Sequence, residues 1–126
     1  PLLEDYVLAE TETDREITVG ATTLRCRMDA VFRRVDRAGW LIVDWKTGRR
    51  QVPVDQLSVY VHAWAASQGA PVGSVRAVYV YVDYPGGRVD ELTDADLLSL
   101  DQIESALTPG SPPDEMTPLP APEQQG

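Results

Sequence analysis

The sequence predicts an α/β (α+β) domain, in which an antiparallel meander of strands is followed by a crossover helix and a central strand. Before residue 47, polar and apolar side chains alternate, which is typical of strands. A segment with helical spacing then leads to an almost purely β-branched and aromatic run at residues 75–82, typical of a strand buried on both faces. A strand–helix–strand connection of this length favours parallel pairing, so we expect a mixed sheet.

Four strands are expected before the helix, because alternation recurs in four segments. These segments are residues 5–12, 15–20, 24–35 and 40–46. In the third segment, one face is expected to be apolar and to consist of Leu24, Cys26, Met28, Ala30 and Phe32.

The turn between the last two strands sets their register. Asp36-Arg37-Ala38-Gly39 has a composition typical of a turn. With Arg37 and Ala38 as a two-residue turn, Asp29 is expected opposite Lys46, and Val31 opposite Asp44. Asp29, Asp44 and Lys46 then lie on one face of the sheet.

Two helices are expected in the second half of the chain. Residues 54–68 have helical spacing, with Asp55 as the cap and Gly69 as the stop. A final helix is expected over residues 94–106, with Thr93 as its cap. From residue 108 the composition changes to Pro, Gly, Ser, Glu and Gln, which predicts a disordered tail. We therefore expect a folded domain over residues 1–107 and a Pro-rich tail over residues 108–126.

Composition narrows the class of protein. A chain of 126 residues with 43% hydrophobic and 25% charged residues is ordinary for one soluble globular domain. No apolar run has the length of a membrane helix, and no signal-peptide pattern is present, so we expect no contact with a membrane. Cys26 is the only cysteine and His62 the only histidine, which excludes an intrachain disulfide and a zinc site built from them. We expect a reducing cytoplasm.

The formal net charge of -9 argues against free-standing binding to nucleic acid, because phosphates attract basic surfaces. The basic residues are concentrated between residues 25 and 50. This distribution favours an acidic module that receives its substrate from a basic partner or from a larger chain.

The predicted face with Asp29, Asp44 and Lys46 is suited to phosphodiester hydrolysis. Two nearby carboxylates can share a hard divalent cation such as Mg²⁺, which keeps several waters. A cation held this way lowers the pKa of its bound water and polarises the phosphate. An ammonium beside it can orient the water or neutralise negative charge in the transition state.

These residues, followed by Gln56-Leu57-Ser58-Val59-Tyr60, resemble the signature of the PD-(D/E)XK nuclease superfamily. The resemblance covers about residues 5–85 and is strongest to the RecB-like branch. That branch typically reads Gly-x-x-Asp on one strand, Asp-x-Lys-Thr-Gly on the next, and Gln-x-x-x-Tyr on the following helix. It implies a restriction-endonuclease-like mixed sheet and the nuclease module of a helicase–nuclease that acts in DNA-end processing, recombination or repair.

The resemblance also implies roles for individual residues. Asp29 and Asp44 match the acids that bind Mg²⁺ or Mn²⁺, with the backbone carbonyl of Trp45 as a further ligand. Lys46 matches the catalytic lysine, and Gln56 and Tyr60 match the pair that flanks the site and contacts DNA. From their positions along the chain, further DNA contacts are expected at Arg27, Arg49 and Arg50. Helicase domains of the same or a partner chain are the expected protein partners.

Two departures from the family pattern bear on activity. Cys26 stands where the family usually has glycine. The family also begins with a helix that carries a Glu or His near the metal, and no such helix precedes this meander, so the chain is expected to be a fragment of a larger protein. Glu10 or Glu12 is a candidate substitute ligand.

Two other functions stay open on the sequence. The chain could be a catalytically inactive nuclease fold that binds DNA or a protein. It could instead be an unrelated small interaction domain in which Asp44 and Lys46 form an edge salt bridge. The last reading requires Asp29 and Asp44 to lie on opposite faces of the sheet.

Overall fold

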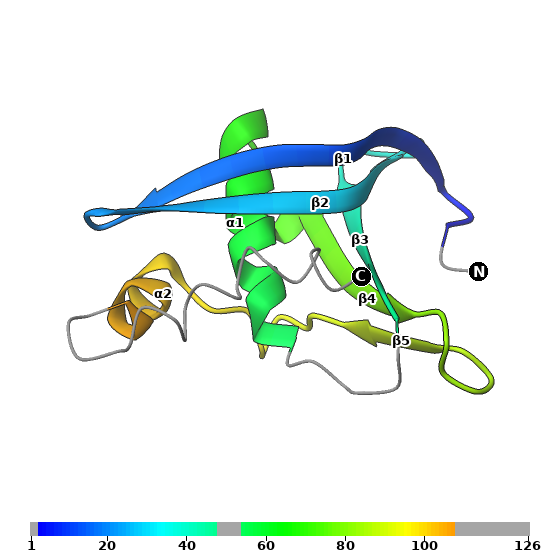
Figure 1. The fold of residues 1–126 in the computed structure, drawn as a ribbon. Helices are drawn as coiled ribbons and strands as arrows, with labels where there is room; N and C mark the ends of the chain where they lie inside the picture. The colour runs from blue at the N-terminus through cyan, green and yellow to red at the C-terminus, as the bar shows by residue number, and fades with distance from the viewer. Residues whose placement is uncertain (1–2, 48–53, 108–126) are drawn as a thin grey trace.

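The computed structural model describes residues 3–47 and 54–107. Within these two ranges, five strands and two α-helices follow one another (Figure 1). In order, the elements are β1 (Tyr6–Val19), β2 (Thr22–Arg34), β3 (Trp40–Lys46), a 3-10 turn (Val54–Gln56), α1 (Leu57–Gln68), a second 3-10 turn (Val72–Ser74), β4 (Val75–Tyr81), β5 (Arg88–Glu91) and α2 (Leu100–Ala106).

The strands form one sheet in the order β1-β2-β3-β4-β5. Neighbouring strands are antiparallel except β3 and β4, which are parallel and are connected through α1. The prediction of a mixed α/β sheet, with a meander, a crossover helix and an interior strand after it, is therefore confirmed.

The first two predicted strands are one strand. β1 pairs with β2 from Tyr6 opposite Arg34 to Val19 opposite Thr22, so the predicted break between residues 12 and 15 was wrong. Cross-strand pairing along β2 overrides the weak local alternation there. At the hairpin tip, Gly20 has φ 61°, a conformation that favours glycine, and a Cβ at this position would displace the end of the Glu104 side chain.

The register between β2 and β3 differs from the predicted one. Val31 pairs with Ile42, not with Asp44, and the connection is wider than a two-residue turn. The backbone N–H of Arg34 donates to the carbonyl of Gly39 at 2.9 Å, while the Arg34 side chain binds both carboxylate oxygens of Asp36 at 2.8 Å. Since the shift is two residues, the side chains keep their faces.

The prediction that the apolar residues of β2 share one face of the sheet was also wrong. Met28 packs in the cluster beneath α1, whereas Ala30 packs in a second cluster on the other face of the sheet. A regular strand would place both on one face, so the alternation of β2 is interrupted at Asp29, between them.

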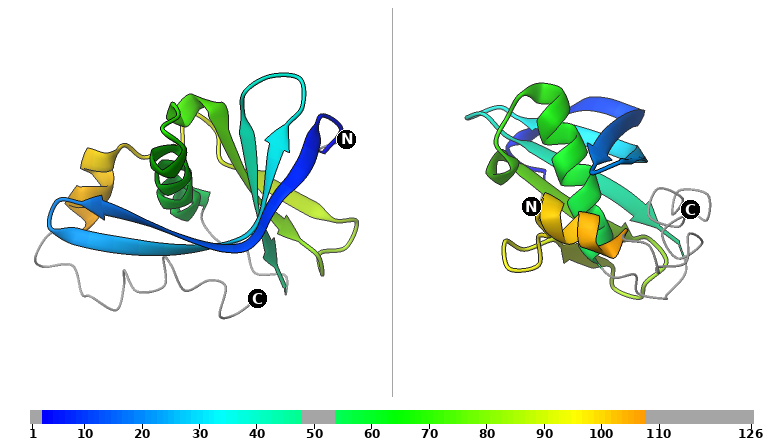
Figure 2. Two further views of the ribbon diagram at one scale, coloured as in Figure 1. Left: turned by 90° about the horizontal axis from the view of Figure 1, so that it is seen from above. Right: turned by 90° about the vertical axis from the view of Figure 1, so that its left-hand side faces the viewer.

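The main core lies between α1 and the sheet. Its largest buried side chains include Trp64, Tyr60, Tyr79 and Tyr81. The second cluster consists of Ala30, Leu41, Val43 and Val78, with Tyr6, Phe32 and Val80 packed around it. Seen from above, α1 lies along the inner side of the bent β1–β2 hairpin, and α2 lies toward the hairpin tip (Figure 2).

The second half of the chain differs from the prediction at three points. α1 begins at Leu57, after a 3-10 turn, and its N-cap is Gln56 instead of Asp55. α1 ends at Gly69 as expected, with φ 63° and its N–H bonded to the last turn. β5 was missed, because only Val89 is apolar among its four residues. α2 begins at Leu100 instead of residue 94, because Ser99 and Gln102 form a capping box.

The start of α2 is fixed by contacts to α1. The backbone N–H of Leu98 donates to Ser58 Oγ at 2.9 Å, and His62 Nε2 lies 2.8 Å from the Leu98 carbonyl. These bonds hold residue 98 outside the helix.

Among the residues that the structure describes, no helix is long and apolar enough to cross a membrane. The predicted tail at residues 108–126 lies outside the described residues.

Candidate active site

Asp44 and Lys46 lie at the carboxyl end of β3, under α1. Asp44 has no exposed surface and Lys46 is 7% exposed, whereas Trp45 between them is 42% exposed. This difference follows from strand alternation, which turns Trp45 to the other face of the sheet. Lys46 Nζ lies 3.1 Å from Asp44 Oδ2, so the two form a buried ion pair.

Asp29 reaches the same place from β2. The paired part of β2 and β3 ends with Ala30 opposite Val43, so Asp29 and Asp44 are the next residues along the two strands. Asp29 Oδ2 accepts a hydrogen bond from the backbone N–H of Trp45 at 2.9 Å. The structure therefore brings Asp29, Asp44 and Lys46 together, although Asp29 lies near Asp44 and Trp45 instead of opposite Lys46 as predicted.

The surroundings of Asp44 favour its protonated form. Burial raises the pKa of Asp44 to about 7, and the neighbouring Asp29 carboxyl acts in the same direction, while Lys46 opposes both. The Lys46 ammonium therefore does not offset the burial of Asp44 beside a second carboxyl group.

Hydrogen bonding at Asp44 is also incomplete. Among the described residues, neither carboxylate oxygen of Asp44 has a hydrogen bond of regular geometry, although Lys46 is close. Buried polar atoms are normally satisfied, so an exception calls for an additional group. A hard divalent cation fits, because carboxylate oxygens are its preferred ligands and waters can complete its shell. Within the part of the chain that the structure describes, no cluster of three His, Cys, Asp or Glu residues could hold a metal, so such a cation would have two protein carboxylates.

The helix contributes the other wall of the site. Gln56 directly precedes α1 and Tyr60 lies in its first turn, where Tyr60 is buried against the sheet. Gln56 Oε1 accepts a hydrogen bond from the hydroxyl of Tyr79 at 3.1 Å. Lys46 Nζ lies 4.9 Å from the centroid of the Tyr79 ring. Tyr79 thus links the predicted lysine to the predicted glutamine.

Tyr79 was missed by the sequence analysis, which treated residues 75–82 only as a buried strand. It pairs with Asp44 in the parallel ladder, and Tyr81 pairs with Lys46. Burial raises the pKa of the Tyr79 hydroxyl, with Asp44 adding to the effect, so Tyr79 is a hydrogen-bond donor here. Tyr79 could have been identified only from its pairing with Asp44 in the parallel ladder. The register of that ladder depends on how the crossover through α1 folds, which the sequence does not give.

Other predicted contacts are placed elsewhere or not described. Arg27 forms ion pairs with Glu12 at 3.1 Å and with Asp14 at 3.6 Å, on the hairpin. Glu10, the other candidate substitute ligand, is bound by Arg15 at 3.1 Å. Both glutamates are therefore held by arginines. Arg49 and Arg50 lie outside the described residues.

The mixed sheet, the crossover helix and the two carboxylates beside a lysine are the features on which the sequence resemblance to a nuclease superfamily depends. The PD-(D/E)XK nuclease superfamily matches residues 3–119 of the chain. This chain belongs to that superfamily, whose members are generally metal-dependent nucleases that hydrolyse nucleic acid.

One similar solved structure is described as "Crystal structure of SSO0001". It is 21% identical, with a TM-score of 0.44, and the match covers 80% of this chain and 51% of that chain. The present chain therefore spans about half the length of that protein. The comparison with curated proteins gave no significant match.

Proposed function

We propose that this chain is the Mg²⁺- or Mn²⁺-dependent deoxyribonuclease module of a helicase–nuclease that acts in DNA-end processing, recombination or repair in the cytoplasm. One observation carries the catalytic part of the proposal. Asp44 is fully buried, its oxygens have no hydrogen bond of regular geometry among the described residues, Asp29 lies beside it, and Lys46 Nζ is 3.1 Å away. Such a cluster has no advantage for stability alone, because a buried charge is costly unless it is fully paired.

Asp29, Asp44 and the backbone carbonyl of Trp45 are the proposed metal ligands. A bound Mg²⁺ or Mn²⁺ would supply an activated water and stabilise negative charge on the phosphate. Lys46 is proposed to orient that water or to neutralise the transition state, since its ammonium is already held at the Asp44 carboxylate. The Tyr79 hydroxyl donates to Gln56, and Gln56 is proposed to contact the DNA backbone.

The charge of the chain supports a partner. With a net charge of -9, the module gains little from general attraction to phosphates, so we propose that helicase domains of the same or a partner chain deliver the DNA. Gln56, Tyr60, Arg27, Arg49 and Arg50 are the proposed DNA contacts. The proposed domain covers residues 1–107, and residues 108–126 form the proposed tail.

The test is cleavage of end-labelled single-stranded and duplex DNA by this chain with Mg²⁺, with Mn²⁺ and with chelator. We expect metal-dependent cleavage that falls about a thousandfold in Asp44→Ala and in Lys46→Ala, because the first removes a proposed metal ligand and the second the proposed catalytic ammonium. Asp94→Ala is the matched control, since Asp94 is an exposed aspartate of a loop. Circular dichroism establishes that each variant is folded.

The outcomes separate the alternatives. Equal cleavage by the wild type and both site variants would remove the proposed mechanism. Mn²⁺ binding measured by calorimetry without any cleavage would point to an incomplete module that needs its partner. Neither binding nor cleavage would favour the alternative, a catalytically inactive nuclease fold that binds DNA or protein.

A further inference from the structure

We infer that Arg15 is a positioning residue, whose guanidinium fixes the irregular part of β1 opposite Asp29 and thereby holds the Asp29 carboxylate against β3. The role of Asp29 at a metal rests on the proposed function, but the positioning of its carboxylate does not.

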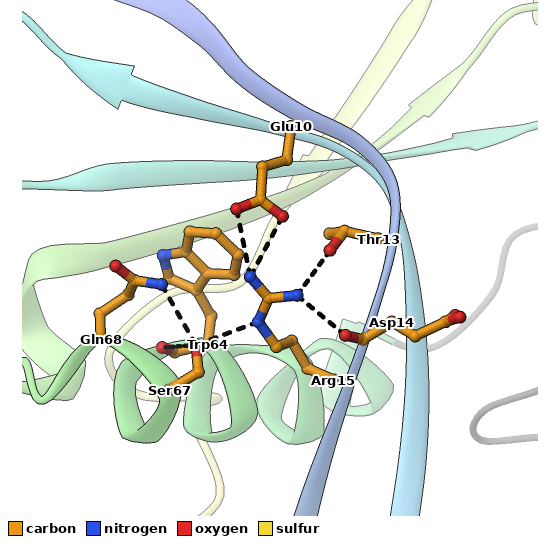
Figure 3. Close-up of polar contacts among 7 residues, drawn as sticks. All are labelled: Glu10, Thr13, Asp14, Arg15, Trp64, Ser67 and Gln68. Atoms are coloured by element: carbon orange, nitrogen blue, oxygen red, sulfur yellow. Dashed lines mark hydrogen bonds and ion pairs between the residues drawn. The ribbon is translucent and has the colours of Figure 1, made fainter.

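Arg15 has a complete set of acceptors (Figure 3). Its Nε donates to Ser67 Oγ at 3.2 Å, and its Nη1 donates to Thr13 Oγ1 at 2.6 Å and to the Asp14 carbonyl at 2.9 Å. Its Nη2 donates to both carboxylate oxygens of Glu10, at 3.1 and 3.2 Å. A guanidinium has five N–H groups in a fixed planar arrangement, and these contacts engage all three of its nitrogens. We call Arg15 with Glu10, Thr13, Asp14, Trp64 and Ser67 the Arg15 clamp.

The Arg15 clamp joins β1 to α1. The Arg15 guanidinium carbon lies 4.7 Å from the centroid of the Trp64 ring, which is buried. Ser67 also donates to the Trp64 carbonyl at 2.8 Å, so its hydroxyl is fixed by the helix. Trp64 lies one helical turn after Tyr60. The clamp therefore connects the strand pair that carries Asp29 with α1, which begins directly after Gln56 and carries Tyr60.

The β1 segment held by the clamp is irregular. The β1–β2 register shifts between Leu8 and Glu10, and Glu12 has φ 48°. Glu12 is the only non-glycine residue with positive φ among those that the structure describes. This conformation is unfavourable for an L-residue and persists only where neighbouring contacts hold it. Arg15 binds side chains on both sides of Glu12, at Glu10 and Thr13, and Figure 3 shows β1 curving around its guanidinium.

This irregular segment faces Asp29. Thr11 pairs with Ala30 and Thr13 pairs with Met28, so Glu12 stands opposite Asp29. At this same point the alternation of β2 is interrupted, because Met28 and Ala30 pack on different faces.

The interruption lets β2 present Asp29 toward β3 while the distal hairpin turns its apolar residues toward α1. The observable consequence is the hydrogen bond from the Trp45 N–H to Asp29 Oδ2 at 2.9 Å.

The proposed positioning is tested by measuring the hydrogen bond between the Trp45 N–H and Asp29 by NMR. The amide proton resonance of Trp45 is measured by NMR in the metal-free chain, in Arg15→Gln, Asp29→Ala and the double variant. We expect Arg15→Gln to move the resonance in the same direction as Asp29→Ala, and to add nothing in the Asp29→Ala background. Arg25→Gln is the matched control, because Arg25 pairs with Glu16 on the exposed outer part of the same hairpin and should leave the resonance unchanged.

A second readout follows metal binding. We expect the Mn²⁺ affinity of Arg15→Gln to fall about tenfold, as for residues that orient metal ligands without touching the metal. If Arg15→Gln does not fold, Arg15→Lys keeps the charge over Trp64 but cannot reach all the acceptors. An unchanged Trp45 resonance in a folded Arg15 variant would overturn the inference. If the wild type binds no Mn²⁺, the proposed function fails and the resonance still decides the positioning role.

Discussion

Two charged clusters pack against α1 and differ in how well they are satisfied. In the Arg15 clamp, one guanidinium with a 23% exposed side chain binds four polar groups and stacks on Trp64. At the end of β3, Asp44 is fully buried next to Lys46, and its oxygens lack hydrogen bonds of regular geometry among the described residues. The first cluster is complete without a ligand, whereas the second is not.

This difference separates stability from function. A satisfied polar network contributes to folding, since every donor exchanges water for a protein acceptor. An unsatisfied buried carboxylate costs stability and is retained where a ligand or a reaction needs it. The comparison therefore predicts opposite signs for substitutions in the two clusters.

The largest effect is expected in the Arg15 clamp. Arg15→Ala should lower the free energy of unfolding by about 2 kcal/mol, because it leaves Glu10 without its partner and uncovers Trp64. Urea denaturation followed by tryptophan fluorescence measures this change. Arg25→Ala is the control, since its side chain is 82% exposed and such ion pairs contribute little. Equal losses in both variants would abolish the distinction between the clamp and an ordinary surface pair.

A smaller effect of opposite sign is expected at the buried ion pair. Replacing both partners with apolar residues, in Asp44→Leu with Lys46→Met, should leave the free energy of unfolding unchanged or raise it by about 1 kcal/mol. Lys46→Met alone should be destabilising, because Asp44 then loses its counter-ion.

The same urea series measures both variants, and the cleavage assay should show no activity in either. A strongly destabilised double variant would mean that the pair supports the fold.

The sequence predicted the order of most elements and the residues that meet at the candidate site, because both depend on short-range patterns. Alternation and the spacing of Asp44 and Lys46 needed only the period of a strand. The β2–β3 register was wrong because the turn closes at Arg34 and Gly39, through contacts of Asp36 that a turn composition does not reveal. The shift by two residues left the faces unchanged, so the predicted grouping of the acids did not depend on the error.

What the sequence could not predict comes from long-range contacts. The role of Tyr79 depends on its parallel pairing with Asp44. The bend of β1 at Glu12 depends on Arg15, whose partner Ser67 lies 52 residues further along the chain. The late start of α2 depends on Ser58. In each case the local segment permits several conformations, and a contact from another element selects one.

The smallest effect on stability is expected from substitution of Asp36, whose pKa is shifted in the opposite direction to that of Asp44. The hydrogen bonds from Arg34 lower the pKa of Asp36 from 3.8 to about 2, whereas burial raises that of Asp44. A lowered pKa means that Asp36 stabilises the fold above about pH 4 and that this contribution disappears as the pH falls toward 2. Asp36→Asn should therefore lose less stability than the wild type as the pH falls between these values. The urea midpoint measured against pH gives this loss, and Asp94→Asn is the control. Because Asp36 is exposed, the change should be small, and an unchanged acid limb would mean that the Arg34–Asp36 contact does not hold the β2–β3 connection in solution.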